Sequence, residues 1–383
     1  MKKVLLVDTS FSSAPIHDCL VQEGFEVFVC GGNPADFLAR VSANYINMDY
    51  SNVAETRALV DSLGIDYVVP GCNDRSYQVC AALNSAGRFP GLDGCGVTET
   101  ISNKRQFREF AARTGLPVPC VISCGQVGDA WPVIVKPVDA YSGRGVSIVS
   151  QAERGILPAA IQQAEAYSRS RTCIIEEYVE GQLYSHSAFI SNGVIQIDFV
   201  VEEHGTANPF VVDTSRVIYD FPDDMLARIR ENVSAMVTQL GLVDGLLHTQ
   251  FVRNGDAYWL IEVTRRCPGD LYSQLIESST GFCYAEAYIK PFTGQAPVLG
   301  DQELAQHFVM RHTVSQSTEI VLGALHFNMP VQIEKLVPLS LAGDTIKASP
   351  FGRIALLFAR SRSEEEFSEL FEATLGRALY SIH

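Results

Sequence analysis

The sequence predicts an α/β protein with three parts. These are a doubly wound parallel-sheet domain in residues 1–100, a central domain of two α+β lobes in residues 101–298, and a small α+β domain in residues 299–383. Three observations support this class. Short apolar runs alternate with helical patterns in the first hundred residues, as in parallel sheets covered by helices. Hairpin patterns dominate the centre, and strands followed by one helix close the chain.

The first domain is expected from a regular succession of strands and helices. The elements, in order, are strand Lys3–Asp8, helix Ala14–Glu23, strand Phe25–Cys30, helix Val53–Leu63 and strand Asp66–Pro70. The loop after the first strand, Thr9–Ser13, contains no glycine, so the dinucleotide-binding pattern G-x-G-x-x-G is missing. This domain is therefore expected to have the shape of a dinucleotide-binding fold without its phosphate site.

The central domain begins with an amphipathic helix, Ser102–Thr114, for which Ser102 is the expected N-cap and Gly115 the stop. A small lid lobe is expected at about residues 116–180, with strands Val133–Lys136, Val146–Val149 and Cys173–Val179. The other lobe is expected to contain the hairpins Leu183–Ile190/Val194–Val201 and Leu246–Arg253/Ala257–Thr264, and the helices Asp224–Leu240 and Tyr272–Thr280. The last part is expected to end in helix Ser363–Thr374.

Charge and composition narrow the function. The chain has 29 Lys and Arg against 44 Asp and Glu, a net charge of −15, so nucleic acid is not expected as a partner. No run of about 20 apolar residues is present, and Asp8 interrupts the first apolar stretch, so neither a membrane span nor a signal peptide is expected. The 10 Cys form no C-x-x-C pair, which favours reduced thiols in a cytoplasmic protein.

Lys136 ends a buried strand, and the glycine-containing turn Tyr141–Gly145 follows it. Glycines let backbone N–H groups converge on an anion, and the lysine adds a positive charge, so this pair can hold a polyphosphate. Taken alone, the pattern is more typical of an ordinary turn beside a solvated lysine. The strand in the acidic segment Ile175–Gly181 could present backbone groups to an adenine, but taken alone the segment is more typical of a solvated acidic loop.

The second hairpin has a polar face. Residues two apart on a strand share a face, so His248 lies beside Gln250 on one strand. On the other strand Glu262, Thr264 and Arg266 share a face. Any half-solvated hairpin alternates in this way. Alternation does not explain why Arg265 and Arg266 follow so closely on the carboxylate of Glu262 and lead into Cys267–Asp270.

Four segments have now been described: the Lys136 strand with its turn, the acidic segment Ile175–Gly181, and the two strands of the second hairpin. In this order they resemble the ATP-grasp superfamily over roughly residues 100–298. The resemblance is strongest to carboxylate–amine ligases related to carbamoyl-phosphate synthase and to L-amino-acid ligases. The resemblance implies that ATP is bound by Lys104, Lys136, Ser142, Gly143, Arg144, Gly145, Glu176, Glu177, Tyr178 and Val179. It implies Mg²⁺ on Glu262 with Gln250 and Thr264, and catalytic parts for Arg266, Lys136 and His248. For His248, a buried structural histidine is an equal alternative.

Three positions depart from the pattern of the superfamily. Gln250 stands where a metal-binding Glu is usual, Thr264 where Asn is usual, and Gly181-Gln182-Leu183 where a Gly-x-Glu often reaches the ribose. Neutral oxygens bind Mg²⁺ without adding charge, so a weaker metal site is expected.

The resemblance implies an ATP-dependent ligase. ATP would convert a carboxylate into an acyl phosphate, an amine would then form an amide or peptide bond, and ADP and phosphate would be released. The expected substrates are amino acids, or an amino acid and another small amine, with Arg216 and Arg311 as candidate contacts or ordinary surface arginines. A homodimer is left open. Two other readings remain: carboxyphosphate chemistry, and a degenerate module that binds nucleotide as a sensor or scaffold.

The metal site also predicts the register of the hairpin. Gln250 and Glu262 must face the same side, and a two-residue turn at Asn254-Gly255 would place them on opposite faces. We therefore predict a three-residue loop, Asn254–Asp256, that sets Gln250 opposite Leu260 and His248 opposite Glu262, or else a β-bulge that restores the alternation.

Overall fold

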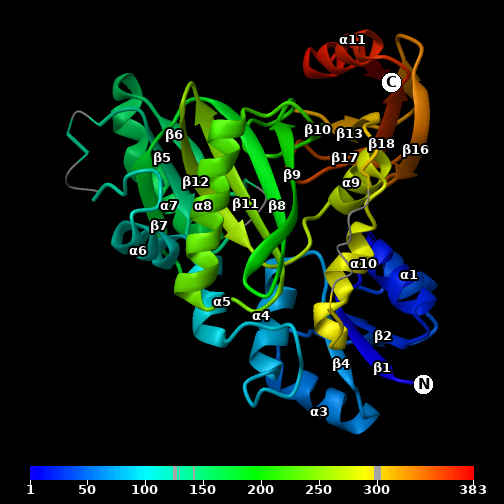
Figure 1. Ribbon diagram of the computed structural model, residues 1–383. Helices are drawn as coiled ribbons and strands as arrows, with labels where there is room; N and C mark the ends of the chain where they lie inside the picture. Colours follow the sequence, from blue (N-terminus) through cyan, green and yellow to red (C-terminus); the bar gives the residue numbers. More distant parts are fainter. Residues whose placement is uncertain (124–126, 129, 141–142, 297–302) are drawn as a thin grey trace.

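The computed structural model describes residues 1–123, 127–128, 130–140, 143–296 and 303–383 (Figure 1). Sheets and helices follow one another as an N-terminal parallel sheet, a small antiparallel sheet and a long antiparallel sheet that continues to the C-terminal part. The expected α/β class is confirmed. In the described part of the chain, no helix is long and apolar enough to cross a membrane.

The N-terminal domain is a four-stranded parallel sheet in the order β3-β2-β1-β4. Its elements are β1 (Lys3–Val7), η1 (Phe11–Ser13), α1 (Ala14–Gln22), β2 (Glu26–Gly31), α2 (Phe37–Val41), β3 (Tyr45–Asn47), α3 (Val53–Leu63), β4 (Tyr67–Pro70) and α4 (Asp74–Leu83). The short elements α2 and β3 were not predicted, because each spans five residues or fewer and carries little periodic signal.

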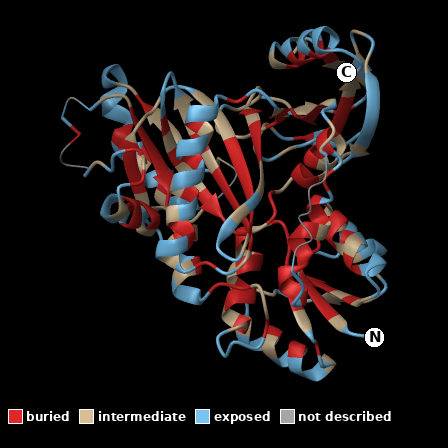
Figure 2. Ribbon diagram, viewed as in Figure 1, coloured by how far each residue is buried: buried red, intermediate tan, exposed pale blue. Residues whose placement is uncertain are grey.

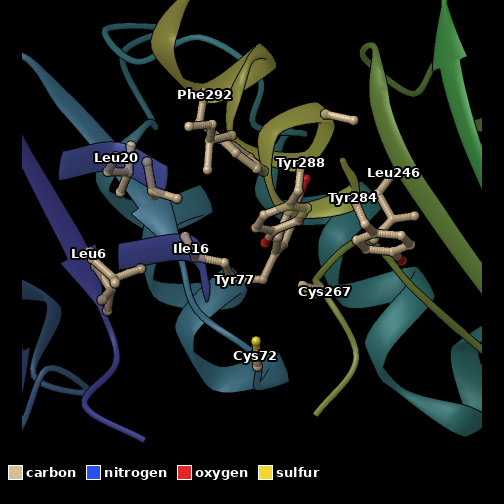
Figure 3. Packing of buried hydrophobic residues seen from close by; sticks show 14 of the residues in the cluster. Leu6, Ile16, Leu20, Cys72, Tyr77, Leu246, Cys267, Tyr284, Tyr288 and Phe292 are labelled. Carbon is tan, nitrogen blue, oxygen red and sulfur yellow. The ribbon is translucent and has the colours of Figure 1, made fainter. Parts of the chain in front are cut away.

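A distant segment completes the core of this domain. The helices α9 (Tyr272–Thr280) and α10 (Tyr284–Ile289) and the turn η4 (Pro291–Thr293) return to the first domain, where α10 packs against α1. Figure 3 shows Tyr288 and Phe292 beside Ile16, Leu20 and Tyr77. Burial of such aromatic side chains contributes about 1.5–3 kcal/mol each, so the chain after residue 270 helps to hold the first domain together.

Helices α5 (Cys95–Ser102) and α6 (Lys104–Thr114) connect the first domain to the lid. The predicted N-cap at Ser102 is wrong. Ser102 ends α5, and Asn103 caps α6 by accepting hydrogen bonds from the N–H groups of Arg105 and Gln106. The predicted stop at Gly115 is confirmed, since Gly115 adopts the left-handed conformation at the end of α6.

The lid is a three-stranded antiparallel sheet in the order β6-β5-β7, covered by a helix. Its elements are β5 (Val133–Pro137), β6 (Ser147–Val149), η3 (Gln151–Ile156), α7 (Leu157–Tyr167) and β7 (Cys173–Glu177). Val133, Val135 and Val149 are fully buried beneath α7.

The long sheet has eight strands in the order β12-β11-β8-β9-β10-β13-β18-β16. Its strands are β8 (Gln182–Ser191), β9 (Val194–His204), β10 (Thr214–Ile218), β11 (Gly245–Asn254), β12 (Ala257–Thr264), β13 (Phe308–Val314), β16 (Gln332–Pro338) and β18 (Ala355–Ser361). Helix α8 (Asp223–Leu240) covers one face, and its outer side is exposed (Figure 2). Three strands from the expected C-terminal domain therefore extend the central sheet.

The remaining elements lie in the C-terminal part. They are β14 (Ile320–Val321), β15 (Leu325–Phe327), β17 (Thr345–Ile346), α11 (Glu364–Leu375) and β19 (Tyr380–Ile382). Phe367 and Phe371 of α11 pack in their own hydrophobic cluster with Leu357 and Met310 of the long sheet. This packing fixes the end of the sheet that carries Arg311.

The hairpin of β11 and β12 has the register that the site requires, reached by a bulge. Asn254 pairs with Ala257 across the two-residue turn Gly255-Asp256, so the predicted three-residue loop is wrong. A bulge between Gln250 and Phe251 then brings Gln250 directly opposite Glu262, and His248 opposite Thr264. The alternative that we predicted, a bulge restoring the shared face, is confirmed.

Candidate functional site

A buried ion triad lies at the lid end of the site. Lys136 donates to Glu176 at 2.8 Å, and Nε of Arg108 donates to the same carboxylate at 2.6 Å. Burial acts to raise the pKa of Glu176, but Lys136 and Arg108 outweigh it and hold that pKa below its ordinary value. Burial lowers the pKa of Lys136, while Glu176 acts in the opposite direction. Glu176 is fully buried, so its side chain positions Lys136 and Arg108 instead of meeting a nucleotide directly.

Arg108 also connects the lid to the hairpin. Its Nη2 donates to the carbonyl of Ile261 at 2.9 Å, and Ile261 is the extra residue of the bulge. The other terminal nitrogen, Nη1, is buried without a hydrogen-bond partner among the described residues. One side chain thus connects the Glu176 carboxylate that holds Lys136 with the bulge beside Glu262.

Gln250 and Glu262 form the candidate metal site. They are cross-strand partners, so their side chains share a face. Gln250 donates Nε2 to Glu203 at 2.7 Å, which leaves Oε1 to face a cation. Glu262 lies 3.6 Å from Nζ of Lys104.

One carboxylate and one amide oxygen fit a Mg²⁺ ion that draws its other ligands from phosphate and water. Within the described ranges, no three His, Cys, Asp or Glu side chains cluster as a self-sufficient metal site. A metal ion at Glu262 would therefore depend on the bound nucleotide.

Arg266 reaches the N-terminal domain. Its Nη2 donates to Asp74 at 3.0 Å, and the Thr264 hydroxyl donates to the other oxygen of Asp74 at 2.9 Å. Nε of Arg266 is buried and has no partner in the part of the chain that the structure describes. Since the Thr264 oxygen also accepts from the Arg266 N–H, this hydroxyl is already engaged. A metal-binding part for Thr264 stays a prediction, and these two bonds weigh against it.

His248 lies in a buried network of hydroxyl groups. Its Nδ1 is 2.8 Å from the Ser187 hydroxyl, and its ring meets Tyr272 edge to face. Burial lowers the pKa of His248 well below its ordinary value, so the ring is neutral. The geometry favours the structural alternative for this histidine over contact with substrate.

The phosphate loop and the adenine hinge are described in part. Ser142 and Tyr141 lie outside the described residues. Gly143 and Gly145 have φ of 67° and 71°, where a side chain would be strained. The exposed Arg144 lies over the ring of Phe351.

At the hinge, the N–H groups of Glu177 and Tyr178 are already bonded to the carbonyls of Cys120 and Pro132. The half-buried Val179 follows them. Backbone contacts of Glu177, Tyr178 and Val179 with adenine stay predictions.

A row of polar side chains crosses the long sheet on the face of the site. Successive strands place Glu262, Gln250, Ser185, Glu203, Ser215 and Arg311 along it. Glu203 accepts from Ser185 at 2.9 Å and is buried. Burial raises the pKa of Glu203 above its ordinary value, although its hydrogen bonds act in the opposite direction. Arg311 belongs to this row, whereas Arg216 lies on the opposite face, paired with Glu202.

A cavity of about 350 Å³ lies at the carboxyl ends of the N-terminal strands and reaches the ion pair of Asp74 and Arg266. Its lining includes Asp8, Asn33, Asp49, Asp74, Arg75 and Arg169. Ligands of open α/β sheets bind outside the carboxyl ends of the strands. The cavity therefore adds a space for a small molecule beside Asp74, the partner of Arg266.

Sequence reasoning missed Arg108, Asp74 and Glu203. Arg108 follows Lys104 by one helical turn and so shares its face, a signal that could have been read. Asp74 opens α4 after the Gly-Cys-Asn loop, but its partner lies 192 positions away. Glu203 sits in a strand predicted to end at residue 201, so its place beside Gln250 had no local signal.

Comparison with known proteins agrees with this geometry. A family model described as "ATP-grasp domain" matches residues 130–274. Phosphoribosylamine–glycine ligase of Pyrococcus horikoshii is 23% identical over an alignment of 292 residues, with 69% of this chain and 66% of that protein covered. Cyanophycin synthetase of Geminocystis herdmanii is 27% identical over 120 residues, 29% of this chain and 13% of that protein. The chain thus covers less than two thirds of both relatives.

Two solved structures share the fold over the whole chain. L-amino acid ligase from Bacillus licheniformis superposes with a TM-score of 0.80 at 15% identity, covering 100% of this chain and 98% of that one. Phosphoribosylglycinamide synthetase from Anaerococcus prevotii superposes with a TM-score of 0.76 at 16% identity, covering 100% and 99%. The match to the ATP-grasp domain model covers residues 130–274 of this chain.

Proposed function

We propose that the protein is an ATP-dependent carboxylate–amine ligase that forms an amide or peptide bond through an acyl phosphate. The observation that carries the proposal is the convergence of Lys104, Lys136, Glu262 and Arg266 in one site of an ATP-grasp domain. The names of the relatives, phosphoribosylamine–glycine ligase and L-amino acid ligase, support this reaction class.

In the first step, a carboxylate oxygen attacks the γ-phosphorus of ATP, and the bond from that phosphorus to the β-phosphate oxygen breaks to release ADP. Lys104 and Lys136 hold the phosphates, and Glu176 and Arg108 keep Lys136 in place. Mg²⁺ on Glu262 and Gln250 would offset the charge that develops on the phosphate oxygens. Arg266, fixed by Asp74, binds the oxygens of the acyl phosphate.

In the second step, the amine nitrogen attacks the acyl carbon and the bond from that carbon to the phosphate oxygen breaks. Phosphate leaves, and the two protons lost by the ammonium group pass to the phosphate and to water. The cavity is the candidate space for the remainder of the carboxylate substrate, because Asp74, the ion-pair partner of Arg266, lines it.

The experiment is a screen for ADP formation over pairs of carboxylic acids and amines, with products identified by mass. ADP formation that depends on the acid, with an amide of the expected mass, supports the ligase. ATP binding without acid-dependent ADP formation would favour the nucleotide-binding sensor. That alternative is suggested by the neutral Gln250, which stands where a metal-binding Glu is usual. Formation of ADP with bicarbonate alone would favour carboxyphosphate chemistry.

A further inference from the structure

Two opposite charges are buried in the polar row and kept apart. Glu203 and Arg311 are 4% and 3% exposed, and neither forms a salt bridge with any residue that the structure describes. They flank Ser215 on adjacent strands, so their Cα atoms are about 10 Å apart, twice the spacing of strands. Buried charges are normally paired, because an unpaired charge loses its hydration without compensation. The separation therefore leaves each of these charges without an opposite charge among the described residues.

Arg311 has donors to spare. Its two terminal nitrogens donate to the Ser215 hydroxyl at 2.8 Å and to the carbonyl of Asp270 at 3.3 Å. Its Nε is buried without a partner among the described residues. A guanidinium group has five N–H donors in a fork that fits a carboxylate. Arg311 can thus take a carboxylate without giving up its present bonds.

The loop that covers Arg311 is strained. Asp270 and Leu271 have φ of 53° and 56°, in the left-handed region that non-glycine residues rarely occupy. Such conformations are energetically unfavourable and cluster at ligand sites. The carbonyl of Asp270 is the one that Arg311 holds, so binding at Arg311 and the conformation of this loop are connected.

Resting on the proposed ligase function, we propose that Glu203 and Arg311 form the subsite of the amine substrate, and that this substrate is an α-amino acid. Arg311 binds its α-carboxylate, and Glu203 accepts hydrogen bonds from its α-amino group. The order along the row decides between the two substrates. Glu203 lies toward Gln250 and Glu262, where the acyl phosphate forms, and Arg311 lies farther away. An acceptor needs its amine at the near end, whereas an acyl donor would need its carboxylate there.

The test compares acceptors that differ only in the carboxylate: L-alanine with ethylamine, L-leucine with isoamylamine, and L-phenylalanine with phenethylamine. The donor acid is found first with hydroxylamine, which traps an acyl phosphate as a hydroxamate and itself lacks a carboxylate. The whole chain is used, and kcat/KM for each acceptor is measured on the same preparation, so a loss of folded protein cancels in the ratio.

We expect the wild-type protein to prefer each amino acid over its amine by about a hundredfold, the effect of a desolvated charge pair. Arg311→Met should reduce this ratio to about threefold or less while hydroxamate formation persists. Arg216→Met is the matched control, since Arg216 lies on the neighbouring strand but on the opposite face, and it should keep the full ratio.

A second variant tests the part proposed for Glu203, the binding of the α-amino group. Glu203→Gln should reduce amide formation with amino acids far more than hydroxamate formation. Equal use of amino acids and amines by the wild type, or an unchanged ratio in Arg311→Met, would overturn the subsite while leaving the ligase intact. Failure of every acid to give a hydroxamate would instead overturn the ligase proposal, and the subsite with it.

Discussion

The two ends of the site treat buried charge in opposite ways. At the lid end, Lys136 and Arg108 both donate to Glu176, at 2.8 and 2.6 Å. At the sheet end, Glu203 and Arg311 are equally buried but are held apart by Ser215. Paired charges fix the position of the side chains that carry them, whereas separated charges can each pair with an opposite charge on a ligand. The lid end is thus built to place one lysine, and the sheet end to recognise a molecule with both charges.

The largest effect should come from breaking the triad. Glu176→Gln leaves Lys136 and Arg108 as buried charges without a carboxylate, and removing one partner of such a group costs about 3–5 kcal/mol. We expect a corresponding loss in the free energy of unfolding, measured by urea denaturation. Asp61→Asn is the matched control, because Asp61 pairs with Arg88 at the exposed surface and should cost less than about 1 kcal/mol. Equal effects of the two variants would mean that the triad is not a stabilising centre.

Removing the cations of the site should separate binding from chemistry. Lys136→Ala should mainly weaken ATP affinity, because the lysine meets phosphate in every state. Arg266→Ala should mainly lower kcat, by about a hundredfold or more, because the charge it binds develops during transfer. Calorimetric ATP titration and steady-state ADP release distinguish the two. Wild-type ADP release by either variant would remove that residue from the site.

Strand β13 sharpens the comparison, since it carries Arg311 on the face of the site and His312 on the other. Burial lowers the pKa of His312 to about 4, helped by Arg311 and Arg377 and opposed by Asp213. The unfolded chain binds a proton near pH 6.5, so this group contributes nothing above that pH. Stability is lost as the pH falls from about 6.5 to about 4, on the order of 3 kcal/mol for one histidine.

Urea denaturation between pH 4 and 7 measures this loss, and His312→Gln should reduce its slope. His326→Gln, at an exposed position of β15, should leave the slope as it is. His248, whose pKa burial also lowers, contributes in the same direction, so part of the slope should remain in His312→Gln. An unchanged slope in that variant would show that His312 is not the group responsible.

The sequence predicted more of the lid end than of the sheet end, for a physical reason. Lys104, Lys136 and the glycines of the phosphate loop lie in short motifs whose chemistry is local. Glu203 and Asp74 become site residues only through strand order and a contact between domains, which no local pattern records. The hairpin shows both cases: the need for a shared face was predicted, but the bulge that achieves it depends on Arg108, 153 positions from Ile261.

The smallest effect is expected at the hydrogen bond that Gln250 donates to Glu203, which connects the candidate metal site with the polar row. Gln250→Glu replaces that hydrogen bond by repulsion between two carboxylates, with Glu262 as a third nearby, and should cost about 1–3 kcal/mol without metal. Mg²⁺ with ATP should recover part of this loss, because the new carboxylate is a better ligand than the amide.

The double variant Gln250→Glu/Glu203→Gln exchanges donor and acceptor and should restore stability to within about 1 kcal/mol, which makes it the matched control. Thermal unfolding with and without Mg²⁺ and ATP measures all three proteins. If the double variant were no more stable than Gln250→Glu, the hydrogen bond to Glu203 would not be what orients residue 250, and the polar row would lose its link to the metal site.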